Sequence, residues 1–194
     1  MSLSSQINSV ARSSYFHIRR IKKLLPFLDD PTLLLLVTSL VLSRIDYCNS
    51  LYYGLPDSIL YPLSKAFNSA ARLVARAPFF SHISPYLVLL HWLSIKYRII
   101  FKICTFMYKS QSKLFPKYLS DILIEPKRPG LRSSSSSRFF LTRVKHSFAK
   151  SAFAFSGPFL WNSLPTSLTI SPSLAKFRAD LKTHLFSKFI EERC

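Results

Sequence analysis

The chain has 194 residues, of which 48% are hydrophobic, so it is long and apolar enough to bury one core or two small ones. Intrinsically disordered proteins typically have a low hydrophobic content, so this composition excludes that class of protein. Lys and Arg number 27 against 9 Asp and Glu, and the resulting formal charge of +18 predicts a polyanionic partner.

Glycine and cysteine contents narrow the fold class further. With only 3 Gly, the chain has no glycine-rich phosphate loop and little material for tight hairpins, which favours helices. An odd number of widely spaced cysteines fits neither a disulfide framework nor a zinc site. We therefore expect reduced thiols, typical of a nuclear or cytoplasmic protein, at Cys48, Cys104 and Cys194.

The first predicted helix is amphipathic. Ser4 or Ser5 can cap its start, and Pro26 should end or kink it near Leu25. At 100° per residue, one side carries the apolar residues Ile7, Val10, Ile18, Ile21, Leu25 and Leu28. The opposite side carries three cations within about 40° of each other, which are candidate nucleic-acid contacts: Arg12, Arg19 and Lys23.

A second helix should begin at Asp30, acting as N-cap with Pro31 at the first helical position, and run to about Leu51. Its most apolar stretch, 33–42, is far shorter than the roughly 20 residues that cross a bilayer, so no membrane partner is expected.

A third helix should follow the turn at 54–57 and run towards Ala75, with Pro62 in its first turn. Its apolar residues recur at intervals of three and four, at Leu63, Ala66 or Phe67, Ala70 and Leu73. Three helices joined by short connections predict a bundle over residues 1–77.

Residues 78–124 are predicted to form a basic helical segment. Ser84 and Pro85 resemble a capped helix start, and a longer helix is expected from about Ile95 to Ser110. The packing face of this helix should contain Trp92, Ile95, Ile99, Ile103 and Phe106. Its flank carries three further candidate nucleic-acid contacts, Arg98, Lys102 and Lys109.

Residues 125–138 contain two Pro, one Gly and five consecutive Ser, a composition typical of a loop or linker. Residues 139–194 should form a C-terminal unit. The aromatic-rich segments 139–144 and 152–155 could form short strands, although periodicity cannot decide this over such short runs. A final helix should open at Ser171 and Pro172 and carry Leu174, Phe177, Leu181 and Leu185.

Positive charge concentrates in one region of the sequence. Between Lys96 and Lys150 there are thirteen Lys or Arg against two acids, with aromatic residues interleaved. This combination is typical of surfaces that follow a phosphate backbone and stack bases, and it does not imply sequence readout. The alternative is a solvated helix face beside core aromatics. Six more candidate contacts lie here: Lys127, Arg128, Arg132, Arg138, Arg143 and Lys145.

No catalytic or cofactor site is predicted. A polymerase needs clustered carboxylates for two metal ions, whereas Asp30, in the adjacent pair with Asp29, is better explained as a helix cap. The five His share no motif with Cys or acids, so no metal ligands are expected. No Gly-x-Ser-x-Gly elbow exposes a serine nucleophile.

Several strings nevertheless share the order of one family. Residues 44–56 read R-I-D-Y-C-N-S-L-Y-Y-G-L-P, followed by N-S-A-A-R-L-V at 68–74, L-H-W-L at 90–93 and L-W-N-S-L-P at 160–165. The chain resembles the region just past the polymerase palm in reverse transcriptases of non-LTR retrotransposons (LINE elements). The resemblance covers nearly the whole chain. It implies a mainly α fold, with a three-helix thumb-like bundle followed by a smaller helical C-terminal unit.

By the same resemblance, we expect a non-catalytic fragment that binds RNA or DNA through its basic helices. Because Met1 falls immediately after the expected palm, catalysis would belong to missing segments, and the sequence leaves open whether a palm and an endonuclease are encoded upstream. One alternative is a non-functional translated remnant, or a partner-dependent interaction protein without specific nucleic-acid binding. Another is a basic protein that binds the membrane surface through amphipathic helices, although this sequence contains no lipid-anchor motif. The sequence leaves RNA or DNA preference and oligomeric state open.

Overall fold

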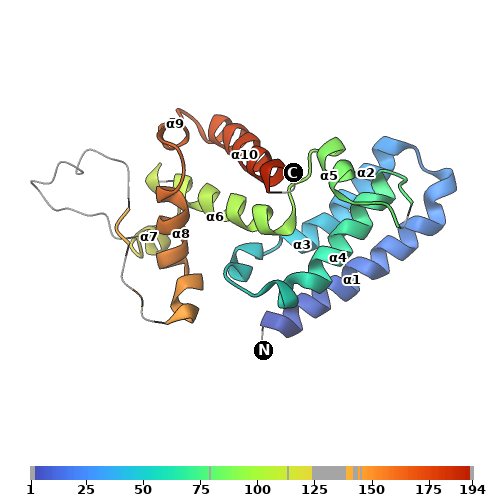
Figure 1. The fold of residues 1–194 in the computed structure, drawn as a ribbon, viewed down its shortest axis with the longest axis horizontal. Helices are drawn as coiled ribbons and strands as arrows, with labels where there is room; N and C mark the ends of the chain where they lie inside the picture. Colours follow the sequence, from blue (N-terminus) through green and yellow to red (C-terminus); the bar gives the residue numbers. More distant parts are fainter. Residues whose placement is uncertain are drawn as a thin grey trace, which may run out of the picture. The chain divides into compact units, whose positions relative to one another are not determined.

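The structure is a computed structural model that describes residues 3–78, 80–112, 114–123, 139–141, 144 and 146–192. Within these ranges the chain is mainly helical and contains no strand, which confirms the predicted mainly α fold (Figure 1). It divides into two compact units, Met1–Arg98 and Ile99–Cys194. The division falls inside a helix of the segment predicted as 78–124.

Unit 1 is built around three helical segments. Helix α1 (Leu3–Leu24) packs against α4 (Asp57–Val74), and both contact a continuous segment made of α2 (Asp30–Val37), η2 (Thr38–Leu42) and α3 (Ser43–Asp46). The shorter elements are η1 (Leu25–Phe27), η3 (Asn49–Tyr52) and α5 (Ser84–Leu89), and α6 (Ile95–Gln111) begins in this unit. Three helical segments therefore pack against one another in unit 1.

The core of unit 1 follows the three-and-four spacing of apolar residues. In α1 the buried residues are Ile7, Ala11, Ser14, Ile18 and Ile21. Ser14 is tolerated inside because its hydroxyl donates a hydrogen bond of 2.8 Å to the carbonyl oxygen of Val10. In α4 the buried set includes the predicted Leu63, Ala66, Phe67, Ala70 and Leu73. The small Ala66 and Ala70 are fully buried, which favours a close approach of the neighbouring helix.

The start of the second helical segment differs from its prediction. Asp29 is the N-cap, although its side chain makes no capping hydrogen bond, and Asp30 is the first helical residue. The Asp30 carboxylate instead accepts a hydrogen bond of 3.0 Å from Nε of Arg76, which is 46 residues away in the sequence. Because this partner lies beyond the last turn of α4, local pattern could not reveal it.

The second helix also ends earlier than Leu51. Helix α3 stops at Asp46, and Cys48 adopts a φ of 53°, in the left-handed region that ends a right-handed helix. Pro62 is the sixth residue of α4, not a first-turn residue as predicted. At that position the proline ring removes one intrahelical hydrogen bond from α4.

A π-helical turn interrupts the second segment at η2. A π turn contains one residue more than an α turn, so it rotates the residues that follow it about the helix axis. Leu33 and Val37 precede it in the core, Val41 and Leu42 within it are buried, and Ile45 continues the buried face after it. The side chains of Ser39 and Ser43 donate to the carbonyls of Leu35 and Ser39, respectively.

Unit 2 packs the remainder of α6 with α8 (Phe153–Asn162) and α10 (Leu174–Glu191), and it includes α7 (Lys117–Ser120), η4 (Ser147–Ser151) and α9 (Thr166–Thr169). Its buried residues include Ile103, Cys104, Met107, Trp161, Phe177, Leu181 and Leu185. Tyr108 stacks on Phe177 with ring centroids 4.6 Å apart, and its hydroxyl donates 2.9 Å to the carbonyl oxygen of Ser171. A Cβ at Gly157 would lie 2.6 Å from Sδ of Met107, so glycine permits this close contact.

The short strands suggested for 139–144 and 152–155 are not observed among the described residues. Residue 152 precedes α8, which contains 153–155. Phe139 is held by two hydrogen bonds with the Asn162 side chain: its N–H donates 3.0 Å to Oδ1, and its carbonyl oxygen accepts 2.8 Å from Nδ2. The aromatic residues in these runs are used in packing, since the ring of Phe139 contacts that of Trp161 at 6.2 Å.

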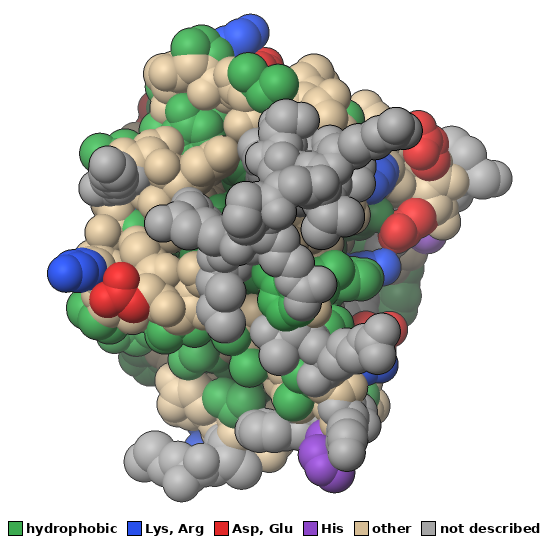
Figure 2. All heavy atoms as spheres, turned by 90° about the vertical axis from the view of Figure 1, so that its left-hand side faces the viewer, with side chains coloured by type: hydrophobic (Ala, Val, Ile, Leu, Met, Phe, Trp, Pro, Cys, Tyr) green, Lys and Arg blue, Asp and Glu red, His purple; other side chains and the backbone are tan. Residues whose placement is uncertain are grey.

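One face of the molecule is shown in Figure 2, turned so that the side of α7, α8 and α9 faces the viewer. Among its described atoms, hydrophobic side chains are more prominent than those of Lys and Arg. Unit 2 exposes several large apolar residues, including Leu114, Tyr118, Ile122 and Phe159. Helix α1 carries five Lys and Arg, all of them exposed.

Candidate nucleic-acid interface

The clearest basic surface lies on α1. The helix has 22 residues and five cations, and the sequence from Leu3 to Leu24 contains no Asp or Glu. All five cationic side chains are exposed, including the three predicted contacts: Arg12, Arg19, Arg20, Lys22 and Lys23. The opposite face is buried against α4 and the second segment. Burial of the apolar face thus fixes which side of α1 presents positive charge to solvent.

A second group of residues on this surface combines Phe16, His17 and Arg20 of α1 with Arg44 of α3. His17 is half-buried on α1, and Arg44 is exposed on α3, which packs against α1. The rings of Phe16 and His17 meet edge to face at 5.3 Å, and the guanidinium of Arg20 lies 5.3 Å from the centre of the Phe16 ring. Sequence reasoning missed this group because Arg44 lies 24 residues beyond Arg20, and only the packing of α3 on α1 brings its charge to act on His17.

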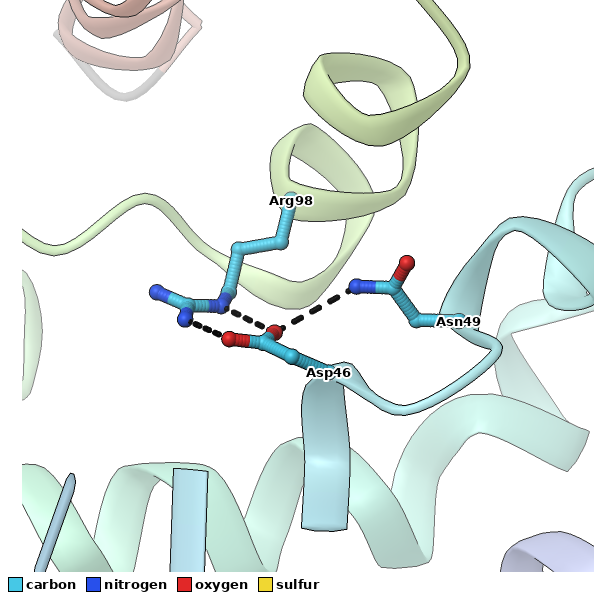
Figure 3. Close-up of polar contacts among 3 residues, drawn as sticks. All are labelled: Asp46, Asn49 and Arg98. Carbon is cyan, nitrogen blue, oxygen red and sulfur yellow. Dashed lines mark hydrogen bonds and ion pairs between the residues drawn. The ribbon is translucent and has the colours of Figure 1, made fainter. Parts of the chain in front are cut away.

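Arg98, predicted to contact nucleic acid, is engaged within the protein (Figure 3). Its Nε donates 2.8 Å to Oδ1 of Asp46, and its Nη2 donates to Oδ2 of the same carboxylate. Asn49 donates a further hydrogen bond of 3.3 Å to Oδ1. The guanidinium also lies 5.4 Å from the centre of the Phe67 ring, and only 20% of the Arg98 side chain is exposed.

This geometry corrects the expectation for Arg98. A bidentate ion pair with a carboxylate neutralises the charge that a phosphate would need, so Arg98 positions α6 against the end of α3. Helical spacing alone predicted Arg98 as a contact, because the Asp46 carboxylate lies 52 residues earlier in the sequence. The bond also gives Asp46 and Asn49 of the R-I-D-Y-C-N string a structural role.

The other two predicted residues of α6 lie in unit 2, where both are half-buried. The ammonium group of Lys102 lies 5.7 Å from the centre of the Phe106 ring, so part of its environment is aromatic. No ion pair involving Lys102 or Lys109 is present within the described residues. Both cations remain predicted contacts with less accessible surface than those of α1.

Six predicted contacts lie outside the described residues: Lys127, Arg128, Arg132, Arg138, Arg143 and Lys145. The predicted loop at 125–138 lies outside them as well. These parts of the basic C-terminal region therefore stay predictions from the sequence.

Packing roles predicted for the two tryptophans are confirmed. Trp92 is 9% exposed and pairs with Phe67 at a ring distance of 5.6 Å. Trp161 is 1% exposed and contacts Phe177 at 5.6 Å. Neither ring is available as an open platform for base stacking.

The buried thiol of Cys104 is not suited to chemistry. Burial raises the pKa of the Cys104 thiol to about 12, and the nearby positive charge of Lys188 only partly opposes this shift. Such a thiol is protonated at neutral pH and unsuited to nucleophilic chemistry. Across the ranges that the structure describes, no three His, Cys, Asp or Glu side chains gather as metal ligands. None of the helices in those ranges combines the length and apolar character that crossing a bilayer requires.

No protein-family model matches the chain, and neither does any curated protein or solved structure. An acid-free row of exposed cations on a long helix can hold an extended array of negative charges, and phosphates are the common biological form of such an array.

Proposed function

We propose that this chain binds the phosphate backbone of RNA or DNA through its basic helices and has no catalytic role of its own. The observation that carries the proposal is the exposed, acid-free set of five cations on α1. Solvated protein surfaces ordinarily mix charges of both signs, which limits self-repulsion. A helix that omits acids altogether is better explained by an anionic partner than by solubility.

The dimensions of α1 suit a nucleic-acid duplex. Arg12 and Lys23 are 11 residues apart, which corresponds to about 16 Å along a helix. Over that length a duplex carries about nine negative charges, counting both strands. Several phosphates therefore lie within reach of the row, and their contacts would position the protein without reading bases.

Helix electrostatics explain only part of the pattern. Lys22 and Lys23 occupy the last turn of α1, where cations interact favourably with the partial negative charge of the helix C-terminus. This effect falls off within one turn, so it does not explain Arg12 in the middle of the helix. The exposure of Arg12 favours a partner for the whole row.

The resemblance to LINE reverse transcriptases adds a more specific proposal. It suggests that unit 1 corresponds to a thumb that grips a template-primer duplex and that the C-terminal region binds template RNA or target DNA. The packing of α1, the second segment and α4 supports this, because the resemblance implies a helical bundle. Polymerase chemistry would then belong to a separate palm-containing segment, and the protein would act in the nucleus or the cytoplasm without a cofactor.

A second candidate function is favoured by exposed apolar residues near the connection between α1 and α2. Phe27 of η1 is 85% exposed and Leu35 of α2 is 66% exposed, whereas Leu33 of α2 is fully buried. Exposed side chains of this size and type are common where a protein partner docks. A palm-containing polymerase segment is the partner that the resemblance suggests, and in that case the charge could be inherited without nucleic-acid binding.

Equilibrium binding tests the proposed function. Fluorescence anisotropy with labelled duplex RNA and duplex DNA of two unrelated sequences should give affinities that differ little between sequences. The logarithm of the association constant should fall linearly with the logarithm of salt concentration. Absence of binding to every duplex at low salt would sink the proposal. In that case, co-purification with a palm segment, measured by gel filtration, would support the partner-dependent alternative.

A further inference from the structure

The group formed by Phe16, His17, Arg20 and Arg44 has a property that the rest of the basic surface lacks. Its His17 side chain can change its charge near neutral pH, whereas the guanidinium groups of Arg20 and Arg44 stay charged. His17 and Arg20 are three residues apart on α1 and therefore lie on neighbouring positions of its surface. The Phe16 ring contacts both the imidazole and the Arg20 guanidinium, which restricts their positions.

The surroundings of His17 are positively charged. Partial burial lowers the pKa of His17, and the positive charges of Arg44 and Arg20 lower it further. Among the described residues, no carboxylate is a cause of the shift in the pKa of His17. In α3, Asp46 is bound by Arg98, and in α2, Asp30 is bound by Arg76.

The remaining elements packed on α1 carry one acid, Asp57 of α4. The η1 and η2 segments consist of uncharged residues. On α4, Lys65 interacts with Tyr61 and Tyr15, and Arg72 donates 3.1 Å to the carbonyl oxygen of Ser81. The one acid of α4, Asp57, lies in its first turn and is not among the charges that shift the pKa of His17.

We propose that His17, Arg20 and Arg44 form a phosphate-binding site at which binding is strengthened by the uptake of one proton on His17. The two guanidinium groups supply planar forks that suit phosphate oxygens. Imidazole gains a second N–H donor and a positive charge when it is protonated. The site rests on the proposed function and adds regulation to it, because nucleic-acid affinity then depends on pH.

The sign of this dependence follows from linkage. In the free protein, His17 stays neutral at pH values where an ordinary histidine is already partly charged. A phosphate beside it offsets the two arginine charges, which raises the pKa of His17 in the complex. The complex therefore takes up a proton, and affinity increases as pH falls through the bound-state pKa. It levels off once His17 is also protonated in the free protein.

The test is a pH series of duplex RNA binding at constant ionic strength, between about pH 5.5 and 7.5, where histidine titrates. Wild-type affinity should rise towards the acid end, by up to about tenfold for a pKa difference of one unit. His17→Gln should remove that part of the rise. His82→Gln is the matched control, because His82 is an exposed histidine of the same unit and should leave the rise unchanged.

A second readout does not depend on the variant's folding. Titration of His17 in the wild-type chain by NMR should give a pKa that increases when duplex RNA is added. In Arg20→Gln combined with Arg44→Gln, the pKa of His17 in the free protein should increase even without RNA. Circular dichroism verifies that each variant is folded.

The outcomes separate the two proposals. If the wild-type chain binds no duplex at any pH, the proposed function itself fails. If it binds, but His17→Gln shows the same pH dependence as wild type or the pKa of His17 does not move with RNA, only the regulatory site is overturned.

Discussion

Asp46 and Arg98 form a bidentate ion pair that joins the end of α3 to the beginning of α6. Their side chains are 33% and 20% exposed, so the pair is partly shielded from solvent. Shielding strengthens the attraction, and the guanidinium also lies over the Phe67 ring. Arg98, although it lies on the basic flank of α6, therefore stabilises unit 1 through Asp46.

Removing either partner should therefore destabilise unit 1. We expect Asp46→Ala to lower the free energy of unfolding by about 2 kcal/mol, because hydrogen bonds to charged groups contribute about 1.5 to 3 kcal/mol. A double-mutant cycle with Arg98→Ala should give a coupling energy above about 1 kcal/mol. Urea unfolding followed by Trp92 fluorescence, in a Trp161→Phe background, measures unit 1 alone.

Asp30 and Arg76 provide the matched control for this cycle. Their side chains are 79% and 45% exposed, so solvent screens the pair. The coupling energy should stay below about 1 kcal/mol, as for other surface ion pairs. Equal coupling energies for the two pairs would contradict the role assigned to Asp46 and Arg98.

Acid should destabilise unit 2 through His184. Burial and the positive charge of Lys188 lower the pKa of His184 below its ordinary value of 6.5, although Glu191 opposes the shift. The unfolded chain therefore binds a proton at a higher pH than the folded chain. The stability linked to neutral His184 is fully present above about pH 6.5, and it is lost as pH falls towards the pKa of His184 in the folded state. Nε2 of His184 is buried without a hydrogen-bond partner in the described structure, so its protonation is unfavourable.

Urea unfolding at neutral and acid pH, followed by Trp161 fluorescence in a Trp92→Phe background, measures this effect. His184→Gln should show a smaller loss of stability in acid than the parent chain. His146→Gln, which changes an exposed histidine of the same unit, should behave like the parent. The same loss in all three proteins would show that other groups cause it.

Cys104 should report on the opening of unit 2. Its thiol is fully buried with a pKa raised to about 12, so both access and ionisation are suppressed in the folded state. In a Cys48→Ser, Cys194→Ser variant, we expect a thiol reagent at mildly alkaline pH to label Cys104 only as fast as unit 2 unfolds. Urea should restore full labelling. Rapid, complete labelling without denaturant would be inconsistent with this packing.

Regular periodicity made much of the fold predictable. The buried face of α4 and the bounds of α6 follow apolar spacing, which depends only on neighbouring residues. Helix α10 carries the predicted buried residues Phe177, Leu181 and Leu185, although Ser173 is its N-cap rather than a serine two residues earlier. In contrast, the residues at 153–155 lie in α8 because short aromatic runs fit either a helix or a strand.

The candidate site was predictable only in part. Arg12, Arg19 and Lys23 lie on the exposed face of α1 as their helical angles required. The different role of Arg98 and the proximity of Arg44 to His17 depend on residues distant in sequence, which no local pattern encodes. The same limit explains Asp30, whose carboxylate binds Arg76 instead of capping its own helix.

The most direct test of the account is the salt dependence of duplex binding after three charges are removed from α1. The variant replaces Arg12, Arg19 and Lys23 with Gln. Its control replaces three exposed lysines of α10, where acids are interspersed, with Gln: Lys176, Lys182 and Lys188. Both variants lose the same net charge.

If α1 contacts phosphates, the α1 variant should bind unrelated duplexes more weakly by similar factors. Its slope of log K against log salt should flatten by up to about 2 to 3 units, at roughly 0.9 per lost contact. The α10 variant should change the slope much less. Equal slopes and affinities in the wild type and the α1 variant would contradict the account and leave α1 as a solvated face.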